Sequence, residues 1–443
     1  MKTMLKKMKR ILCLALCICM ILPMSGCNTD KPREHVPYEY SEKNEISEAV
    51  ETEAEACFKY LWELAQTDEE SGAYGLVRDR YPNDRNKAST AATGFALAAI
   101  PYAIEKGWIT QEEGFERADK TMDTLLSLEN HSGFLFHFIN MLNGNHSKGS
   151  EVSVIDTGIL LCGAIVAGEY FGGTVYEKMQ QFYDNIDWSF YLNPQTQMFY
   201  MGYNAETDEF SGAWDVYGEQ LMLYVLSAGS STHALDKTPY YTFKRLEGTY
   251  NGHTFVHSWF GSIFTYQFSH AFIDFRGKVD EKGMDWYQNS VEATLAHRDY
   301  AITNALGSKT YSENSWGLTA CDTIDGYDGL QGCPPSGGGN SAHRSNGHVA
   351  TAGAIGSMPF APEYCTAALE NYVTYEKLMG EYGLLDAYNL DKNWYARDYV
   401  GIDKGISILM IANYESDIIW DLFMQNENVQ KGMDVLGFKD KAE

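Results

Sequence analysis

Two carboxylic acids stand among aromatic residues in the segment 211–227, Ser-Gly-Ala-Trp-Asp-Val-Tyr-Gly-Glu-Gln-Leu-Met-Leu-Tyr-Val-Leu-Ser. On a helix, Asp215 and Glu219 would share a face because they are four residues apart, with Trp214 and Tyr217 close by. Aromatic rings pack on the apolar faces of sugar rings, and acids bind the hydroxyl groups. The apolar run 221–226 is too continuous for a surface helix, so the acidic end is predicted to open into a cavity. The segment therefore indicates a sugar site.

Acids and aromatic residues recur in further clusters at the ends of predicted helices. The candidate substrate-binding residues are Arg78, Asp79, Asp156, Trp214, Asp215, Tyr217, His270, Asp274, Arg276, Glu313, Trp316, Phe360, Glu363 and Trp394. Some of these clusters also have a structural explanation. Arg78 and Asp79 could form a solvated ion-pair patch. His270 and Asp274, four residues apart, could orient a ring between helices. Their recurrence at corresponding helix ends is nevertheless typical of a lined cleft.

Glu151 and Asp156 stand where a nearly apolar helix is expected to begin. Glu151 could simply favour the helix dipole at the first turn, or it could act in a site. Asp156 lies deeper, so it is either a paired acid of the core or a residue of the cleft. The sequence leaves both alternatives open.

Carboxylates are the abundant reactive groups of this chain. It has no Gly-x-Ser-x-Gly elbow, phosphate-binding loop, dinucleotide fingerprint or HExxH zinc helix. The histidines lack convincing metal-ligand spacing, so no metal and no other cofactor is expected. Glycoside hydrolysis needs two carboxyl groups, one protonated and one ionised, and apolar surroundings can raise the pKa of the acid. The composition thus favours hydrolysis of a sugar linkage.

A long series of helices must position these residues. Helical periodicity predicts helices at 45–66, 90–106, 111–129, 152–170, 174–187, 213–228, 260–273, 284–304, 348–357, 363–380, 404–414 and 416–426. Thr110 followed by Glu113 forms a capping-box pattern, and the segments 196–210 and 248–257 alternate like hairpins. We expect an all-α fold with these few hairpin excursions, arranged as an (α/α)6 barrel of two concentric rings. An open solenoid is the alternative, but no repeat of fixed period supports it.

The first 26 residues combine five basic residues with the apolar run 11–22, as a secretory signal peptide does. Met-Ser-Gly before Cys27 matches a lipobox, which would make Cys27 the lipidated first residue of the mature chain; ordinary cleavage with a free Cys27 is the alternative. Residues 27–44 read as a flexible tether and 45–443 as one domain. We therefore expect a lipid-anchored protein on the extracellular face of the cell envelope.

The net charge is −26, or −31 without the five basic residues of the predicted signal peptide. This charge disfavours nucleic acid as a partner and is compatible with a neutral oligo- or polysaccharide. The membrane is expected to be reached through the lipid anchor only, and the protein to be a monomer. Cys57 and Cys162 read as buried thiols, whereas Cys321 and Cys333 could be free or form a disulfide.

With these residues assembled, the chain from about residue 50 to 430 resembles the bacterial glucoamylase-like family that includes the endo-β-1,2-glucanases of glycoside hydrolase family 144. Seven ordered motifs carry the resemblance: 75–79 (GLVRD), 150–157 (SEVSVIDT), 214–219 (WDVYGE), 269–276 (SHAFIDFR), 313–320 (ENSWGLTA), 357–363 (SMPFAPE) and 401–405 (GIDKG). The resemblance implies an (α/α)6 barrel, metal-independent cleavage of a β-glucan and export.

The same resemblance implies roles for three acids. Glu219 matches the proton donor of the family, and Glu151 and Asp403 match other important acids of its cleft. The stretch 143–149 lacks aspartates that some members carry, so the general base is left open between Glu151 and Asp403. A transglycosylase or exo-acting hydrolase of the same barrel, and an oligosaccharide-binding lipoprotein without activity, are the alternatives to an endo-β-1,2-glucanase.

Overall fold

Nearly apolar helices fill the interior of the protein. The computed structural model describes residues 37–442, so the predicted signal peptide, Cys27 and most of the predicted tether lie outside the described residues. The innermost helices are α3 (Thr90–Glu105), α5 (Val154–Phe171), α7 (Leu221–Gly229), α10 (Thr351–Ile355) and α12 (Gly401–Ser416). Among the described residues, α5 is the one helix long and apolar enough to cross a bilayer, but 94% of it is buried inside the protein. Its composition is therefore that of a core helix.

Glycines set the distance between α3 and α5. A Cβ atom on Gly163 would lie 1.8 Å from the carbonyl oxygen of Gly94, and one on Gly94 would lie 2.5 Å from the Cα of Leu160. Neither position accepts a larger residue without a shift of backbone, since these neighbours are main-chain atoms. The two helices thus cross at backbone contact in the centre of the fold.

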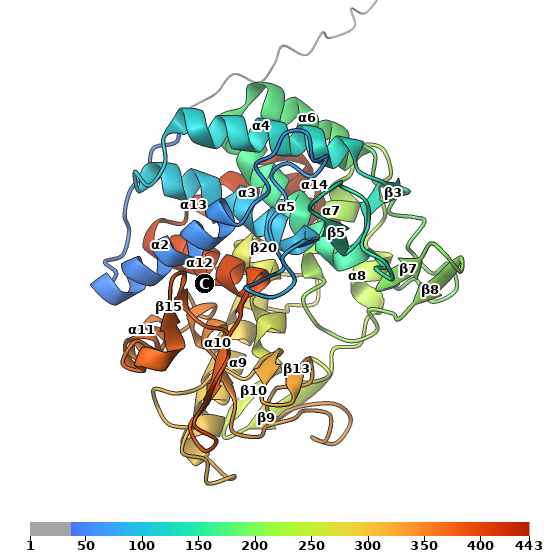
Figure 1. Ribbon diagram of the computed structural model, residues 1–443. Helices are drawn as coiled ribbons and strands as arrows, with labels where there is room; N and C mark the ends of the chain where they lie inside the picture. The colour runs from blue at the N-terminus through green and yellow to red at the C-terminus, as the bar shows by residue number, and fades with distance from the viewer. Residues whose placement is uncertain (1–36, 443) are drawn as a thin grey trace, which may run out of the picture. The chain divides into compact units, whose positions relative to one another are not determined.

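Other helices cover this interior. They are α2 (Glu48–Glu63), α4 (Gln111–Ser127), α6 (Gly173–Asp184), α8 (Thr238–Thr242), α9 (Trp286–Thr303), α11 (Pro362–Tyr372), α13 (Ile418–Met424) and α14 (Glu427–Leu436). Figure 1 shows α4 and α6 over α3 and α5, which they contact. The capping box predicted for α4 is confirmed: Thr110 Oγ1 accepts from the Glu113 amide, and Glu113 Oε2 accepts from the Thr110 amide at 2.8 Å.

Short antiparallel strands connect the helices, and they are more numerous than the few hairpins we expected. The pairs are β1 (Arg80–Tyr81) with β19 (Tyr399–Val400), β2 (Lys87–Ser89) with β5 (Phe138–Asn140), β3 (Asn130–His131) with β4 (Phe134–Leu135), β6 (Val152–Ser153) with β7 (Gly202–Asn204) and β7 with β8 (Glu209–Ser211), β9 (Glu247–Tyr250) with β10 (His253–Val256), β11 (Lys278–Val279) with β20 (Lys439–Asp440), β12 (Cys321–Thr323) with β13 (Gly326–Asp328), β14 (Val349–Ala350) with β17 (Ala387–Asn389) and β17 with β18 (Trp394–Tyr395), and β15 (Met379–Gly380) with β16 (Gly383–Leu384). The two predicted hairpins are confirmed as β7–β8 and β9–β10.

Four of these strands run directly into inner helices. β2, β6, β14 and β19 end at the residues before α3, α5, α10 and α12. Pairing of β1 with β19 and of β2 with β5, and bridges from Arg78 to Ala88 and from Phe136 to Val152, hold several of these starts together. The amino-terminal ends of inner helices therefore gather at one end of the fold.

Several predicted helices are wrong in part. Residues 213–220 are not helical, because the Trp214 amide donates to the Phe199 carbonyl and the Tyr217 amide to the Lys244 carbonyl instead of to a preceding turn. The segment 260–273 contains two 3-10 helices, η1 (Ile263–Tyr266) and η2 (Ser269–Ala271), in place of one α-helix. The predicted helix 363–380 ends as α11 at Tyr372, and the rest of that range holds a third 3-10 helix, η3 (Glu376–Leu378), and β15. Tertiary hydrogen bonds thus override local helical periodicity beside the predicted cavity.

Candidate active site

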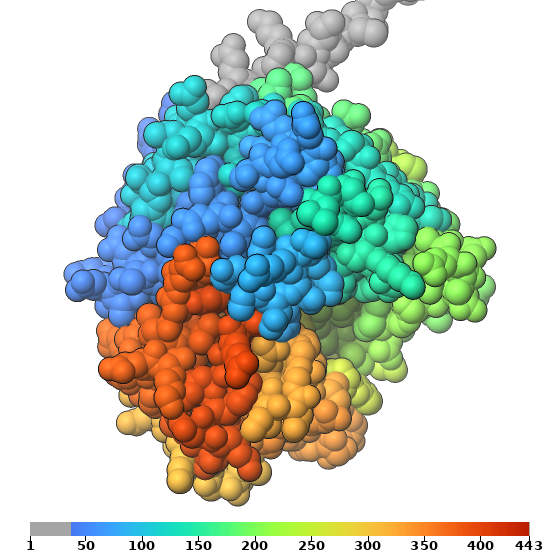
Figure 2. Space-filling view, viewed as in Figure 1, coloured from blue at the N-terminus to red at the C-terminus, as the bar shows by residue number. Residues whose placement is uncertain are grey.

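Glu219 lines a cavity of about 280 Å³ in front of α7. The cavity is bordered by Met201, Ala213, Trp214, Val216, Tyr217, Gly218, Ser258, Trp259, Phe260, Ser262, Phe264, Thr265 and Gly329. In Figure 2 the surface is hollowed between the light-blue segment before α3, the orange segment with β12 and β13, and green segments behind them. Burial among this largely apolar lining, together with a smaller contribution from the charge of Asp156, raises the pKa of Glu219 to about 7. A substantial fraction of the carboxyl is therefore protonated at neutral pH.

The backbone of Glu219 is held from the segment 260–273. The Ser269 hydroxyl donates to the Glu219 carbonyl at 2.5 Å and accepts from the Met222 amide at 3.1 Å. Ser269 therefore joins η2 to the start of α7 and fixes the point from which the Glu219 side chain enters the cavity.

The other acid and rings of the 211–219 segment take different places. Tyr217 is buried and stacks on Trp286, with ring centroids 4.8 Å apart, so it supports the cavity wall. Trp214 is also mostly buried but borders the cavity. Asp215 forms an ion pair with Lys244 at 3.0 Å and is not among the residues that line the cavity. The shared helical face predicted for Asp215 and Glu219 does not exist.

Trp259 and Phe260 are the exposed large aromatic residues of this cavity, with 45% and 37% of their surfaces accessible. The backbone around them is fixed, because the Trp259 carbonyl accepts from Gly337 and a Cβ on Gly332 would lie 2.2 Å from the Phe260 carbonyl oxygen. Sequence reasoning missed both rings. Their only signal was an adjacent aromatic pair at the start of a predicted helix.

His137 joins two predicted acids. Its Nδ1 lies 2.9 Å from Glu151 Oε1, and its Nε2 lies 3.5 Å from Asp156 Oδ1. Burial lowers the pKa of His137, but the carboxylates of Asp156, Glu151 and Asp79 outweigh burial and hold it at about 9. The hydrogen bond from His137 lowers the pKa of Glu151. Glu151 is thus ionised and paired with a cation, which no local sequence pattern indicated.

A second acidic group surrounds Arg80. This guanidinium lies 3.1 Å from Asp322, 3.2 Å from Asp398 and 3.9 Å from Asp79. Burial raises the pKa of Asp79, and the nearby positive charge of His137 lowers it in part. Asp79 therefore lies between the His137 group and the Arg80 group.

Asp403 lies in the first turn of α12, beside this second group. Burial raises the pKa of Asp403, and a hydrogen bond from Asp386 lowers it in part. Asp386 is an acid of the loop before β17 that the sequence did not single out. Trp394 lies nearby on β18, where it packs on a cluster with Cys321, Ala350 and Ala387. Asp403 and Trp394 thus lie at the same end of the fold as Glu219, although far from it in sequence.

Several predicted substrate-binding residues lie outside the cleft. His270 is fully buried, burial lowers its pKa to about 3, and its Nε2 contacts Ser290 Oγ at 3.0 Å. Phe360 packs edge-on against this ring, and Trp316 is completely buried. Since these side chains have little or no accessible surface, they serve the core.

Asp274 and Arg276 are also removed from the candidate site. Arg276 pairs with Asp274 at 2.8 Å and with Asp417 at 3.0 Å. Asp417 caps the carboxyl end of α12, roughly 21 Å along the helix from Asp403. The ion pairs of Arg276 therefore stabilise the end of the fold opposite to the candidate site.

Glu313, Glu363 and Arg78 occupy further places. Glu313 and Glu363 are exposed beside Arg298 of α9, which donates to the Glu313 carbonyl and lies over the ring of Tyr364 on α11. Arg78 lines a polar pocket of about 100 Å³ with residues such as Gln66 and Arg85, instead of the cavity of Glu219. Alternation along the chain sends Arg78 and Asp79 to different sides.

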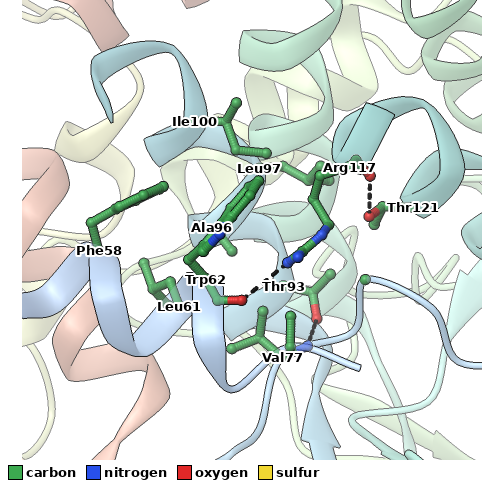
Figure 3. Close-up of a pocket in the computed structure, with 12 residues that line it drawn as sticks. Phe58, Leu61, Trp62, Val77, Thr93, Ala96, Leu97, Ile100, Arg117 and Thr121 are labelled. Carbon is green, nitrogen blue, oxygen red and sulfur yellow. Dashed lines mark hydrogen bonds between the residues drawn. The ribbon is translucent and has the colours of Figure 1, made fainter. Parts of the chain in front are cut away.

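A small cavity between α2, α3 and α4 does not form part of the site. Figure 3 shows Arg117 reaching toward Trp62, to whose carbonyl it donates at 3.1 Å. The guanidinium lies 4.0 Å from the Trp62 ring centroid. The free space of about 10 Å³ has room for about one water molecule, so this cavity cannot take a substrate.

The described residues contain no group of three or more His, Cys, Asp or Glu side chains placed to hold a metal ion. Cys57, Cys162, Cys321, Cys333 and Cys365 are all free and buried. Cys321 and Cys333 are therefore not joined in this structure. The chemistry available at the site is that of carboxyl groups, one imidazole and aromatic surfaces.

Comparisons with known proteins agree with a carbohydrate site. Residues 211–427 match the Glycoamylase family model, described as "Putative glucoamylase". The chain is 28% identical to an exo β-1,2-glucooligosaccharide sophorohydrolase (non-reducing end) of Parabacteroides distasonis, over 86% of this chain and 56% of that protein. The chain thus spans about half the length of this relative.

Two solved structures are similar to this chain over most of its length. An endo-β-1,2-glucanase from Chitinophaga pinensis, in complex with sophorotriose and glucose, superimposes with a TM-score of 0.80 at 26% identity, covering 89% of this chain and 99% of that chain. A β-1,2-glucanase from Parabacteroides distasonis superimposes with a TM-score of 0.79 at 26% identity, covering 88% of this chain and 59% of that one.

Proposed function

The chain belongs to the glucoamylase-like family, and from this premise we propose that it is a glycoside hydrolase that cleaves β-1,2-linked glucan internally. The observation that carries the proposal is Glu219, a carboxyl with a raised pKa inside a cavity that exposes Trp259 and Phe260. The names of the similar proteins support the β-1,2 linkage.

In the proposed reaction, Glu219 gives its proton to the glycosidic oxygen as the bond from that oxygen to the anomeric carbon breaks. A water molecule attacks the anomeric carbon and passes a proton to a carboxylate, which restores the proton balance. We assign this carboxylate to Asp403, because Glu151 is held by His137. Trp259 and Phe260 offer apolar surfaces for the sugar rings.

We further propose the (α/α)6 arrangement for the helices, since inner helices start together at the site and other helices cover them. We also propose export, lipid attachment at Cys27 on the extracellular face of the envelope, and a monomeric state; the sequence of the first 44 residues supports the export and the attachment.

We expect kcat/KM to fall as the pH rises through about 7, because Glu219 must be protonated to act as the acid. The raised pKa means that the active form prevails below this value and is lost above it. Initial rates over a pH series measure the effect, with circular dichroism as the control for folding. An alkaline limb that appears only near the pKa of tyrosine or lysine would exclude Glu219 as the titrating acid.

Product analysis on purified linear β-1,2-glucan tests the proposal. Internal cleavage gives a mixture of short oligosaccharides from the first minutes. Release of sophorose alone would instead assign the exo activity for which the Parabacteroides relative is named. Tight binding by calorimetry with no product after hours would overturn the enzyme and favour a binding lipoprotein.

A further inference from the structure

The carboxyl groups of Asp386 and Asp403, the proposed general base, lie next to each other in the interior. Asp386 is 3% exposed, and its carboxyl contacts that of Asp403. One buried oxygen on each side, Asp386 Oδ1 and Asp403 Oδ2, receives no hydrogen bond from any other group among the described residues. Two ionised carboxylates in this position would repel each other without a donor between them.

Asp386 is held in place by the main chain. Its Oδ2 accepts from the Asp322 amide at 2.6 Å, its amide donates to the Asp398 carbonyl at 3.1 Å, and its carbonyl accepts from the Thr351 amide at 3.0 Å. The backbone of Asp386 is therefore fixed by two segments, and its carboxyl cannot turn away from Asp403 without breaking the bond from the Asp322 amide. Asp403, in contrast, is partly exposed.

We propose that Asp386 is a positioning residue that keeps a proton and donates it in a hydrogen bond to Asp403, so that Asp403 stays ionised and oriented as the general base. This inference rests on the proposed function for the role of Asp403. The proton bridge itself follows from the two facing carboxyl groups. One shared proton satisfies both buried oxygens and removes one negative charge from the pair.

The charged groups around Asp386 and Asp403 favour one proton shared between the two carboxyl groups. Asp322 adds a negative charge from β12, and the Cys321 thiol and Tyr327 phenol lie within electrostatic range on the same hairpin. Arg80 on β1 and Lys404 on α12 supply positive charge to Asp403. Arg80 is shared with Asp322, Asp398 and Asp79, and Lys404 with Glu53 at 2.7 Å, so these cations do not neutralise both members of the pair.

Infrared spectroscopy tests the proton without relying on turnover. In an E219Q background, which removes the Glu219 carboxyl, we expect a protonated-carboxyl C=O band at neutral pH that disappears in E219Q/D386N. Absence of the band in E219Q would show that both acids are ionised and overturn the proposal. Persistence of the full band in E219Q/D386N would place the proton on a carboxyl other than that of Asp386 and overturn it as well.

Kinetics of D386A and D386N test the positioning role in the otherwise intact protein. D386A removes the donor, so we expect kcat to fall at least tenfold with KM nearly unchanged, and the acid limb of the pH profile to move to higher pH. In D386N the amide NH2 can still donate to Asp403, and the amide oxygen can still accept from the Asp322 amide. This variant should therefore restore kcat and the acid limb to near the original values. Equal profiles for D386A and the original protein would refute the role.

The infrared and kinetic results separate the two levels of inference. If the original protein releases no product from β-1,2-glucan, the proposed function fails while the infrared band still reports on the Asp386 proton. If E219Q is inactive but D386A is unaffected, the function stands and the positioning role fails.

Discussion

Replacing Glu219 with Gln should lower kcat for β-1,2-glucan hydrolysis about 1,000-fold, the effect of losing a general acid. Gln keeps the shape of the side chain but has no proton to give to the leaving oxygen. Because the raised pKa of Glu219 comes mainly from burial, the neutral amide should not destabilise the fold. Reducing-sugar release by purified E219Q, with thermal unfolding measured alongside, gives the result.

E209Q is the matched control for this substitution. Glu209 lies on β8 and is exposed, so the same change of charge there should leave kcat and KM unchanged. Full turnover by E219Q would disprove the assignment of the acid. A matching loss in E209Q would show that the assay responds to charge and not to proton transfer.

Replacing Asp403 with Asn should also reduce kcat by about 1,000-fold, because the amide cannot accept a proton from the attacking water. The expected KM is close to the original, since Trp259 and Phe260 remain in place for binding. Steady-state kinetics on defined β-1,2-glucooligosaccharides separate kcat from KM.

E151Q distinguishes the two acids between which the general base was left open. Glu151 is neutralised by His137 at 2.9 Å, so its replacement should cost only roughly tenfold, by loosening His137 and Asp156. A loss in E151Q as large as that expected for D403N, together with near-normal D403N, would make Glu151 the base.

The helices of the core could be predicted from local pattern. The apolar runs around 90–105 and 154–171 mark buried helices wherever they are placed, and the polar cap at Thr110 and Glu113 marks the start of α4. Where distant segments supply the hydrogen-bond partners, the same helical spacing of apolar residues predicted a helix that does not form. Residues 213–220 have helical spacing, but their amides are used by Phe199 and Lys244.

The sequence by itself determined the helical class, the abundance of carboxyl and aromatic groups and the family resemblance that singled out Glu219, Glu151 and Asp403. The tertiary structure alone decided which groups meet. His137 reaches two acids, Asp386 faces Asp403, and Trp259 enters the cavity of Glu219, while His270 and Trp316 are enclosed in the core. The reason is physical: a protonation state depends on the burial and charge that surround a group, and these are set by segments far apart in the chain.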